Sequence, residues 1–176
     1  MLLNNFLLII VSSTSNDIPA LVRLVNSAYR GEGSKKGWTT EADLLDGTRT
    51  DEANLSDLMS DPKAVILKCS NGNEEIIACV YLQKQQGRLY LGMLSVSPDI
   101  QGGGIGKALL AAADEHATKN NCSSVFMTVI SVRHELIAWY ERHGYVKTGE
   151  KKPFPTGEKF GIQKQPLELI VLEKML

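Results

Sequence analysis

The sequence predicts a mixed α+β fold, in which strands form one sheet and helices pack against it. Three strand-like runs in the middle of the chain, 64–69, 76–83 and 88–96, are separated by polar or glycine-containing turns, which is typical of an antiparallel meander. The apolar spacing changes to a helical period on either side, over about 17–29 and 104–119. With 176 residues, 43% of them hydrophobic, we expect one core and a single domain over 1–176.

The N-terminal part predicts a strand followed by a helix. Residues 6–11 form a short apolar run rich in branched side chains, with no basic start and no small-residue cleavage site, so a strand is favoured over a signal peptide. Asp17 and Pro19 mark a helix start, after which Ile18, Leu21 and Val25 share one face. Glycines and lysines over 31–37 interrupt the pattern.

The remaining elements follow from caps and breakers. Thr40 and Asp43 form a pair like a capping box, Gly47 interrupts, and a clearer helix spans about 51–59. A strand is expected over 125–129, a short helix over 135–143 that ends with Gly144 at the C′ position, and two last strands over 145–148 and 167–172. Residues 151–164, rich in proline and glycine, predict a loop.

Composition narrows the class of function. A formal net charge of −1, with interspersed signs, gives no field that would gather nucleic acid or an anionic membrane, and no apolar segment approaches the roughly 20 residues of a membrane span. Cys69, Cys79 and Cys122 lie in apolar segments without metal-ligand spacing, which indicates buried thiols in a reducing compartment. We therefore expect a cytoplasmic protein without a metal, in which any anionic ligand is bound locally.

The turn QGGGIG, residues 101–106, is the strongest local feature. It follows the strand that ends at Val96 and opens a helix, whose first amides have no partner within the helix and lie at the positive end of its dipole. Glycines let a phosphate approach the backbone. The turn alone leaves two interpretations open, an anion site or a connection without a ligand. Neither the dinucleotide fingerprint nor the P-loop fits, because Lys107 and Gln101 stand where those motifs require glycine.

Two longer segments resemble the GCN5-related N-acetyltransferase (GNAT) family. The stretch SVSPDIQGGGIGKALL is similar to its acetyl-CoA motif, and ELIAWYERHGYVKTGE to the helix and strand that follow it. The resemblance is densest over 88–150. It implies a mixed, mostly antiparallel sheet of about seven strands flanked by about four helices, with strands splayed at the cofactor site and acetyl-CoA as co-substrate.

The resemblance also implies which residues hold the cofactor. Backbone amides of the turn would bind the pyrophosphate, Lys107 would add charge, and the strand before the turn would pair with the pantetheine arm as a peptide adds to a sheet edge. The implied contacts are Leu94, Ser95, Val96, Gln101, Gly102, Gly103, Gly104, Ile105, Gly106, Lys107 and Arg133.

Tyr140 is the predicted catalytic residue. The resemblance places this tyrosine near the cofactor sulfur as a general acid, and a phenol with a reference pKa of about 10 can protonate a thiolate whose parent thiol is near 8.5. Without the resemblance, Tyr140 beside Trp139 on a short helix is an ordinary core aromatic.

This sequence departs from the family pattern at two positions. Gly92 stands where many members have a carboxylate that serves as base or substrate contact. Arg133 stands where many have an asparagine; it could contact a cofactor phosphate or an acidic acceptor, but an exposed position at the helix start is favoured. No histidine in the motif region is an obvious base.

The acceptor residues are predicted from position alone. Glu41 and Asp43 lie in the segment that borders the acceptor cleft in the family, and could attract a cationic amine, although capping of a helix is the alternative. Trp38 could line the acceptor pocket or cover the core. Phe154 and Phe160, in the loop over 153–160, could close over the acceptor.

These observations predict an acetyl-CoA-dependent N-acetyltransferase that acts on a small-molecule or peptide amine. Two alternatives remain open, a non-catalytic acyl-CoA-binding domain, favoured by Gly92, and the same fold with a hydroxyl acceptor. The sequence leaves the acceptor, the base, the acyl-chain length and the choice between monomer and homodimer open.

Overall fold

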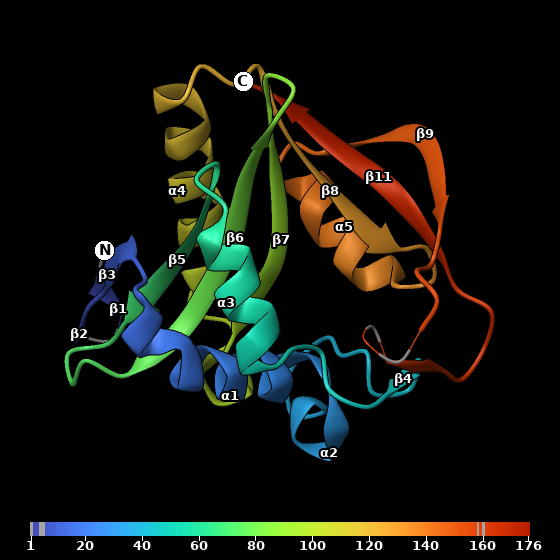
Figure 1. Cartoon of the computed structure of the whole chain (residues 1–176), viewed down its shortest axis with the longest axis horizontal. Coiled ribbons are helices and arrows are strands. Elements are labelled where there is room, and N and C mark those ends of the chain that lie inside the picture. The colour runs from blue at the N-terminus through green and yellow to red at the C-terminus, as the bar shows by residue number, and fades with distance from the viewer. Residues whose placement is uncertain (1, 4–5, 158, 160) are drawn as a thin grey trace.

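The structure is a computed structural model of residues 1–176 that describes residues 2–3, 6–157, 159 and 161–176. Its main sheet contains β3 (Ile9–Ser12), β5 (Ala64–Ser70), β6 (Ile76–Gln85), β7 (Arg88–Val96), β8 (Ser124–Ile130), β9 (Val146–Pro153) and β11 (Glu168–Met175). The strand order is β3-β5-β6-β7-β8-β11-β9 (Figure 1). All neighbouring pairs are antiparallel except β7 and β8, which run parallel. The predicted mixed, mostly antiparallel sheet is confirmed.

Helices pack on both faces of this sheet. On one face, α1 (Ile18–Tyr29) and α3 (Glu52–Ser60) share an apolar cluster with side chains such as Cys79 and Tyr81 of β6. On the other, α4 (Ile105–Lys119) and α5 (His134–Arg142) share a cluster with Val80 and Leu82. Successive residues of β6 thus point to opposite layers, as a strand buried on both faces requires. The sheet thus lies between two layers of helices (Figure 1).

Local capping explains several element ends. Asp51 precedes α3, and its Oδ1 accepts a hydrogen bond from the Asn54 amide at 2.7 Å. Gly144 follows α5 with a φ of 93°, a left-handed conformation that favours glycine at C′, as predicted. The helix over 104–119 also lies where its apolar period placed it.

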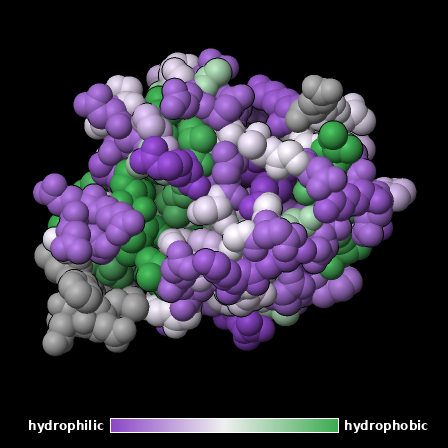
Figure 2. Space-filling view, turned by 90° about the horizontal axis from the view of Figure 1, so that it is seen from below, coloured by the Kyte–Doolittle hydropathy of each residue, from purple (hydrophilic) through white to green (hydrophobic). Residues whose placement is uncertain are grey.

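The N-terminal strand differs from the prediction. The single strand predicted over 6–11 is divided, because β2 (Phe6–Leu7) pairs with β1 (Leu2–Leu3) and only β3 joins the main sheet. β3 is an edge strand, and its Ile9 and Val11 are 46% and 45% exposed. Seen from below (Figure 2), apolar surface gathers on the side that holds the N-terminus, and hydrophilic side chains cover most of the rest of that face.

The segment after α1 also differs. A short helix, α2 (Gly31–Ser34), lies where a break was predicted, and no helix follows Thr40. Thr40 Oγ1 instead accepts from the Ala42 amide at 3.0 Å. The chain then forms β4 (Leu45–Asp46), which pairs with β10 (Ile162–Gln163). This pairing with a segment more than a hundred residues away replaces the predicted local helix, and it draws the loop after β9 against the loop after α2.

β7 and β8 separate after a short common stretch. Their pairing is confined to Leu89 with Val125 and Tyr90 with Phe126, although β7 continues to Val96 and β8 to Ile130. A bulge in the β6–β7 ladder accompanies the separation, and Met93 within it has a φ of 54°. The strand splay implied by the sequence resemblance is therefore present, and β7 and β8 diverge toward their C-terminal ends (Figure 1).

Candidate active site

Two cavities meet at the splayed strands. The first, which we name the glycine groove, has a volume of about 510 Å³ and runs from the turn before α4 to α5. The second, which we name the arginine cavity, has a volume of about 180 Å³ and lies between β7, β8 and the loops after α1 and β9. Both are lined by the same five residues, namely Tyr29, Leu94, Arg133, Leu136 and Tyr140. The two cavities are therefore adjacent.

The turn before α4 is shaped to bind an anion. Gly102 and Gly104 have φ values of 90° and 80°, which favour glycine, and Gly104 caps the helix. A Cβ at Gly102 would meet no atom within 4 Å, so the turn is open. Lys107 and Arg142 add positive charge to the lining. Free helix amides, an open glycine turn and two cations fit the pyrophosphate of coenzyme A.

Most of the predicted cofactor residues line this groove together. They are Leu94, Val96, Gln101, Gly102, Gly104, Ile105, Gly106, Lys107 and Arg133. Gly103 and Ser95 do not line it, and the Ser95 hydroxyl donates to the Met93 carbonyl at 3.1 Å within the core. Gly106 allows close packing of α4 on α5, since a Cβ there would lie 3.3 Å from the Trp139 ring.

Gln101 ties the outer loop to the strand. Its Oε1 accepts from the Trp38 amide at 2.9 Å, and its Nε2 donates to the Val96 carbonyl at 3.1 Å. The Trp38 ring is 48% exposed and lies 6.2 Å from the Trp139 ring. Trp38, predicted as an acceptor contact, lines the glycine groove and not the arginine cavity.

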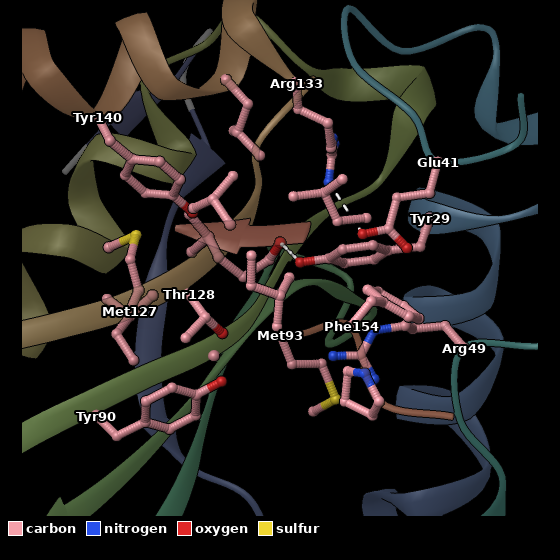
Figure 3. Close-up of a pocket in the computed structure, with 18 of the residues that line it drawn as sticks. Tyr29, Glu41, Arg49, Tyr90, Met93, Met127, Thr128, Arg133, Tyr140 and Phe154 are labelled. Atoms are coloured by element: carbon pink, nitrogen blue, oxygen red, sulfur yellow. Dashed lines mark hydrogen bonds and ion pairs between the residues drawn. The ribbon is translucent and has the colours of Figure 1, made fainter. Parts of the chain in front are cut away.

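Tyr140 projects from α5 and lines both cavities, and Figure 3 shows it at the arginine cavity. It is 5% exposed, and its ring packs edge-on against Trp139 and Tyr145. No other side chain or backbone group in the described residues hydrogen-bonds its hydroxyl. Burial, followed by the charge of nearby Tyr29, raises the pKa of Tyr140 well above 10. The phenol is therefore protonated at neutral pH and faces the site without an internal partner.

Glu41 and Arg133 form a buried ion-pair network. Glu41 Oε2 lies 3.1 Å from Arg30 Nε, and Glu41 Oε1 lies 3.1 Å from Arg133 Nη1. Arg133 Nη2 also donates to Thr39 Oγ1 at 2.8 Å. The exposed position favoured for Arg133 is wrong: it is 6% exposed, because the loop after α2 covers the start of α5 and supplies its carboxylate partner.

Gly92 and Tyr90 explain the absent carboxylate. A Cβ on Gly92 would lie 2.8 Å from Cε1 of Tyr90 and 3.1 Å from its hydroxyl. Tyr90 points into the arginine cavity, and its ring packs edge-on against Phe126 (Figure 3). The phenol occupies the space that a side chain at position 92 would need.

The other predicted acceptor residues are placed differently from one another. Phe154 lines the arginine cavity beside Pro155. Asp43 lines neither cavity; it is exposed and pairs with Lys35 at 3.3 Å. Phe160 lies outside the described residues. The predicted site is thus drawn together at Glu41, Arg133, Phe154 and Tyr140.

Several site residues were not found from the sequence. Tyr29 donates from its hydroxyl to the Leu94 carbonyl at 3.0 Å, and Arg49 lies over the Tyr29 ring, with its Cζ 5.5 Å from the centroid. His143, beside Trp139, lines the glycine groove. In the sequence, Tyr29 continues the apolar face of Ile18, Leu21 and Val25, and the hydroxyl at the end of this face is the one signal that could have indicated a site residue. Arg49 had none, because only tertiary folding brings its loop to the cavity.

Neither a metal centre nor a membrane span is found in the part of the chain that the structure describes. No three His, Cys, Asp or Glu side chains there are grouped to hold a metal ion. None of the described helices is long and apolar enough to cross a bilayer.

Comparisons with known proteins agree with this geometry. The chain is 27% identical over 99 residues to the acetyltransferase Atu2258 of Agrobacterium fabrum, which covers 56% of this chain and 71% of the relative. The fold of this chain is similar to that of a ribosomal-protein-alanine N-acetyltransferase from Brucella melitensis, with a TM-score of 0.69 and 20% identity. The similarity covers 96% of this chain and 99% of the other.

The fold also resembles the paia N-acetyltransferase of Thermoplasma acidophilum, solved in complex with coenzyme A, with a TM-score of 0.71, 16% identity and coverage of 97% of this chain and 99% of the other. The model of the acetyltransferase (GNAT) family matches residues 21–145, which include the glycine turn and Tyr140. Acetyltransferases of this kind take their acetyl group from acetyl-CoA. The chain belongs to the acetyltransferase (GNAT) family.

Proposed function

We propose that this chain transfers the acetyl group of acetyl-CoA to the primary amine of an acceptor bound in the arginine cavity. The observation that carries the proposal is the position of Tyr140, which lines both the glycine groove and the arginine cavity. A group at that junction can contact a donor in one cavity and an acceptor in the other.

The glycine groove supplies the donor site in this proposal. Amides of the turn over 102–106, with Lys107, bind the pyrophosphate, and the backbone near Leu94 and Val96 holds the pantetheine arm. The Leu94 carbonyl already accepts from Tyr29, and the Val96 carbonyl from Gln101, so both strand positions are fixed before the cofactor binds. Bound acetyl-CoA supplies an activated thioester.

As the amine nitrogen bonds to the carbonyl carbon and the carbon–sulfur bond breaks, Tyr140 supplies the proton that the sulfur takes. The proton that the nitrogen loses as the amide forms restores the phenol. Its raised pKa makes the phenol a donor at neutral pH, since an ionised tyrosinate could not give a proton. The same burial makes it a weaker acid. A thiolate released into the same cavity is desolvated as well, so the pKa of the CoA thiol also rises. The pKa values of the phenol and the thiol therefore shift in the same direction, which keeps proton transfer between them favourable.

The acceptor amine must be neutral to attack. Glu41 is engaged by two guanidinium groups, so it is held in place as their counter-ion and is not free to act as a base. The cations around the cavity favour the uncharged form of a bound amine, because like charges lower the pKa of an ammonium group. Loss of the amine proton to solvent is thus assisted by the electrostatics of the site.

The experiment compares Tyr140→Phe with Tyr145→Phe. Both tyrosines are buried, but Tyr145 lines neither cavity, and its hydroxyl has no hydrogen-bond partner in the described structure, so it is a matched control. Release of CoA thiol with an amine panel is measured. We expect kcat to fall about 100- to 10,000-fold in Tyr140→Phe, with CoA affinity retained. Equal rates in the two variants would overturn the tyrosine's role, and no amine-dependent release from the wild type would overturn the transfer itself.

A further inference from the structure

The arginine cavity carries an excess of positive charge. Among the described residues, three guanidinium groups line it, those of Arg30, Arg49 and Arg133, against one carboxylate, that of Glu41. The lining therefore holds two positive charges in excess, in a chain whose formal net charge is −1. The excess is local, and its source is the residues that surround the candidate acceptor site.

Glu41 does not balance this charge. Its two oxygens are each 3.1 Å from a different arginine, so one negative charge serves both Arg30 and Arg133. The Nε atom of Arg133 is buried and has no hydrogen-bond partner in the described part of the chain. A buried donor without a partner is costly. The positive charge of the lining, rather than this buried atom, is what an anion in the cavity could offset.

Of the three arginines that line the cavity, Arg49 makes the fewest interactions with the described residues. Its guanidinium lies over the Tyr29 ring, and no carboxylate of the described residues forms an ion pair with it. Its backbone amide is fixed by Asn26 Oδ1 at 2.8 Å, which holds the loop independently of the side chain. A guanidinium presented in this way can bind a carboxylate or a phosphonate with two parallel hydrogen bonds.

The two ends of the cavity suit two ends of one molecule. Tyr140 and Arg49 lie on opposite sides of the cavity in Figure 3, and Phe154 also lines it. An acceptor with its amine toward Tyr140 would present its other end to Arg49. The volume of about 180 Å³ suits a small molecule. A second ammonium group on the acceptor would meet a net positive charge there.

We infer that the acceptor is a small amine that also carries an oxyanion, as an α-amino acid or an aminoalkylphosphonate does, and that Arg49 binds this oxyanion. The inference rests on the proposed acetyl transfer and specifies its substrate class. It disfavours polyamines and lysine side chains, which bring additional positive charge or no anion.

The first test uses matched acceptors. Amino acids are compared with their carboxamides and with their decarboxylated amines, and aminoalkylphosphonates form a separate arm that distinguishes the two oxyanions. We expect kcat/KM to be about 10- to 100-fold higher for an oxyanion-bearing acceptor than for its neutral counterpart, as charged hydrogen bonds of this type imply. Neutral amides or decarboxylated amines that react as well as the acids would overturn the inference while leaving acetyl transfer intact.

The second test removes the guanidinium. Arg49→Met should abolish the preference for the oxyanion, chiefly by raising KM, and Arg49→Lys should restore part of it. Arg23→Met is the control, because Arg23 is exposed on α1, lines neither cavity and changes the net charge equally. A preference that survives in Arg49→Met, or that is lost equally in Arg23→Met, would contradict the assignment.

Calorimetric binding separates the two proposals. Binding of an amino acid and of its amide is titrated with and without CoA, so the readout does not require turnover. Oxyanion binding that depends on Arg49, in a protein that releases no CoA, would support the anion site and refute acetyl transfer. Acetyl transfer to neutral amines, with no Arg49-dependent binding, would support acetyl transfer and refute the anion site.

Discussion

Replacement of Glu41 by glutamine tests the buried network that shapes the arginine cavity. The glutamate side chain is 9% exposed, and its partners Arg30 and Arg133 have side chains that are 5% and 7% exposed. Glutamine has nearly the same shape, so the change removes the charge and leaves the packing. Two buried guanidinium groups then lose the carboxylate that both of them contact.

The cost follows from that geometry. Removal of one partner from a buried ion pair destabilises a protein by about 3–5 kcal/mol, because the remaining charge stays desolvated. Here one carboxylate serves two arginines at 3.1 Å each, so we place the loss at the upper end of that range, about 4–5 kcal/mol. This is a large part of the 5–15 kcal/mol that is typical of a folded domain. The free energy of unfolding is measured by urea titration, followed by circular dichroism.

Asp43→Asn is the matched control for this prediction. Asp43 lies two residues away in the same loop, but its side chain is 76% exposed and pairs with Lys35 at the surface. An exposed pair contributes little, so the urea midpoint should not change measurably. A loss below about 1 kcal/mol in Glu41→Gln would refute the reasoning, because the two arginines would then be solvated without their carboxylate.

Two further predictions concern the walls of the site and its response to pH. Gly92→Ala should force the Tyr90 ring away from its place and destabilise the protein by about 1–3 kcal/mol, with a raised KM for the acceptor and unchanged calorimetric affinity for CoA; an unchanged acceptor KM would contradict this. Burial raises the pKa of Tyr29 and of Tyr81 to about 12, whereas unfolded tyrosines ionise near 10. Because the unfolded chain then binds fewer protons than the folded one, the contribution of these two phenols to the free energy of unfolding should be constant below pH 10 and fall between pH 10 and 12. Urea titrations across this range measure it, and constant stability up to pH 12 would contradict the burial of these phenols.

The features that could be predicted from the sequence are those whose cause is local. The turn over 101–106 could be predicted because its conformation depends on consecutive residues: glycines with positive φ are followed directly by the start of a helix. The C′ glycine of α5 is local in the same sense. The splay of β7 and β8 was implied by resemblance alone, since nothing in either strand by itself shows that they part.

The features that could not be predicted depend on distant partners. Glu41 and Asp43 look alike in the sequence, yet one is buried between two arginines and the other is exposed, because β4 pairs with β10 and fixes how the loop turns. Arg49 reaches the cavity through the same tertiary arrangement. Position 92 has no side chain because the ring of Tyr90, two residues earlier on the same face of β7, occupies the space that one would need.

A crystal structure of the complex with CoA tests the central claim most directly, because it measures the donor site and the Tyr140 junction together. We predict that the pyrophosphate oxygens accept from the amides of the turn over 102–106, and that the CoA sulfur lies within about 3.5 Å of the Tyr140 hydroxyl, the reach of a hydrogen bond. A sulfur placed away from Tyr140, or a pyrophosphate bound outside this turn, would contradict the account.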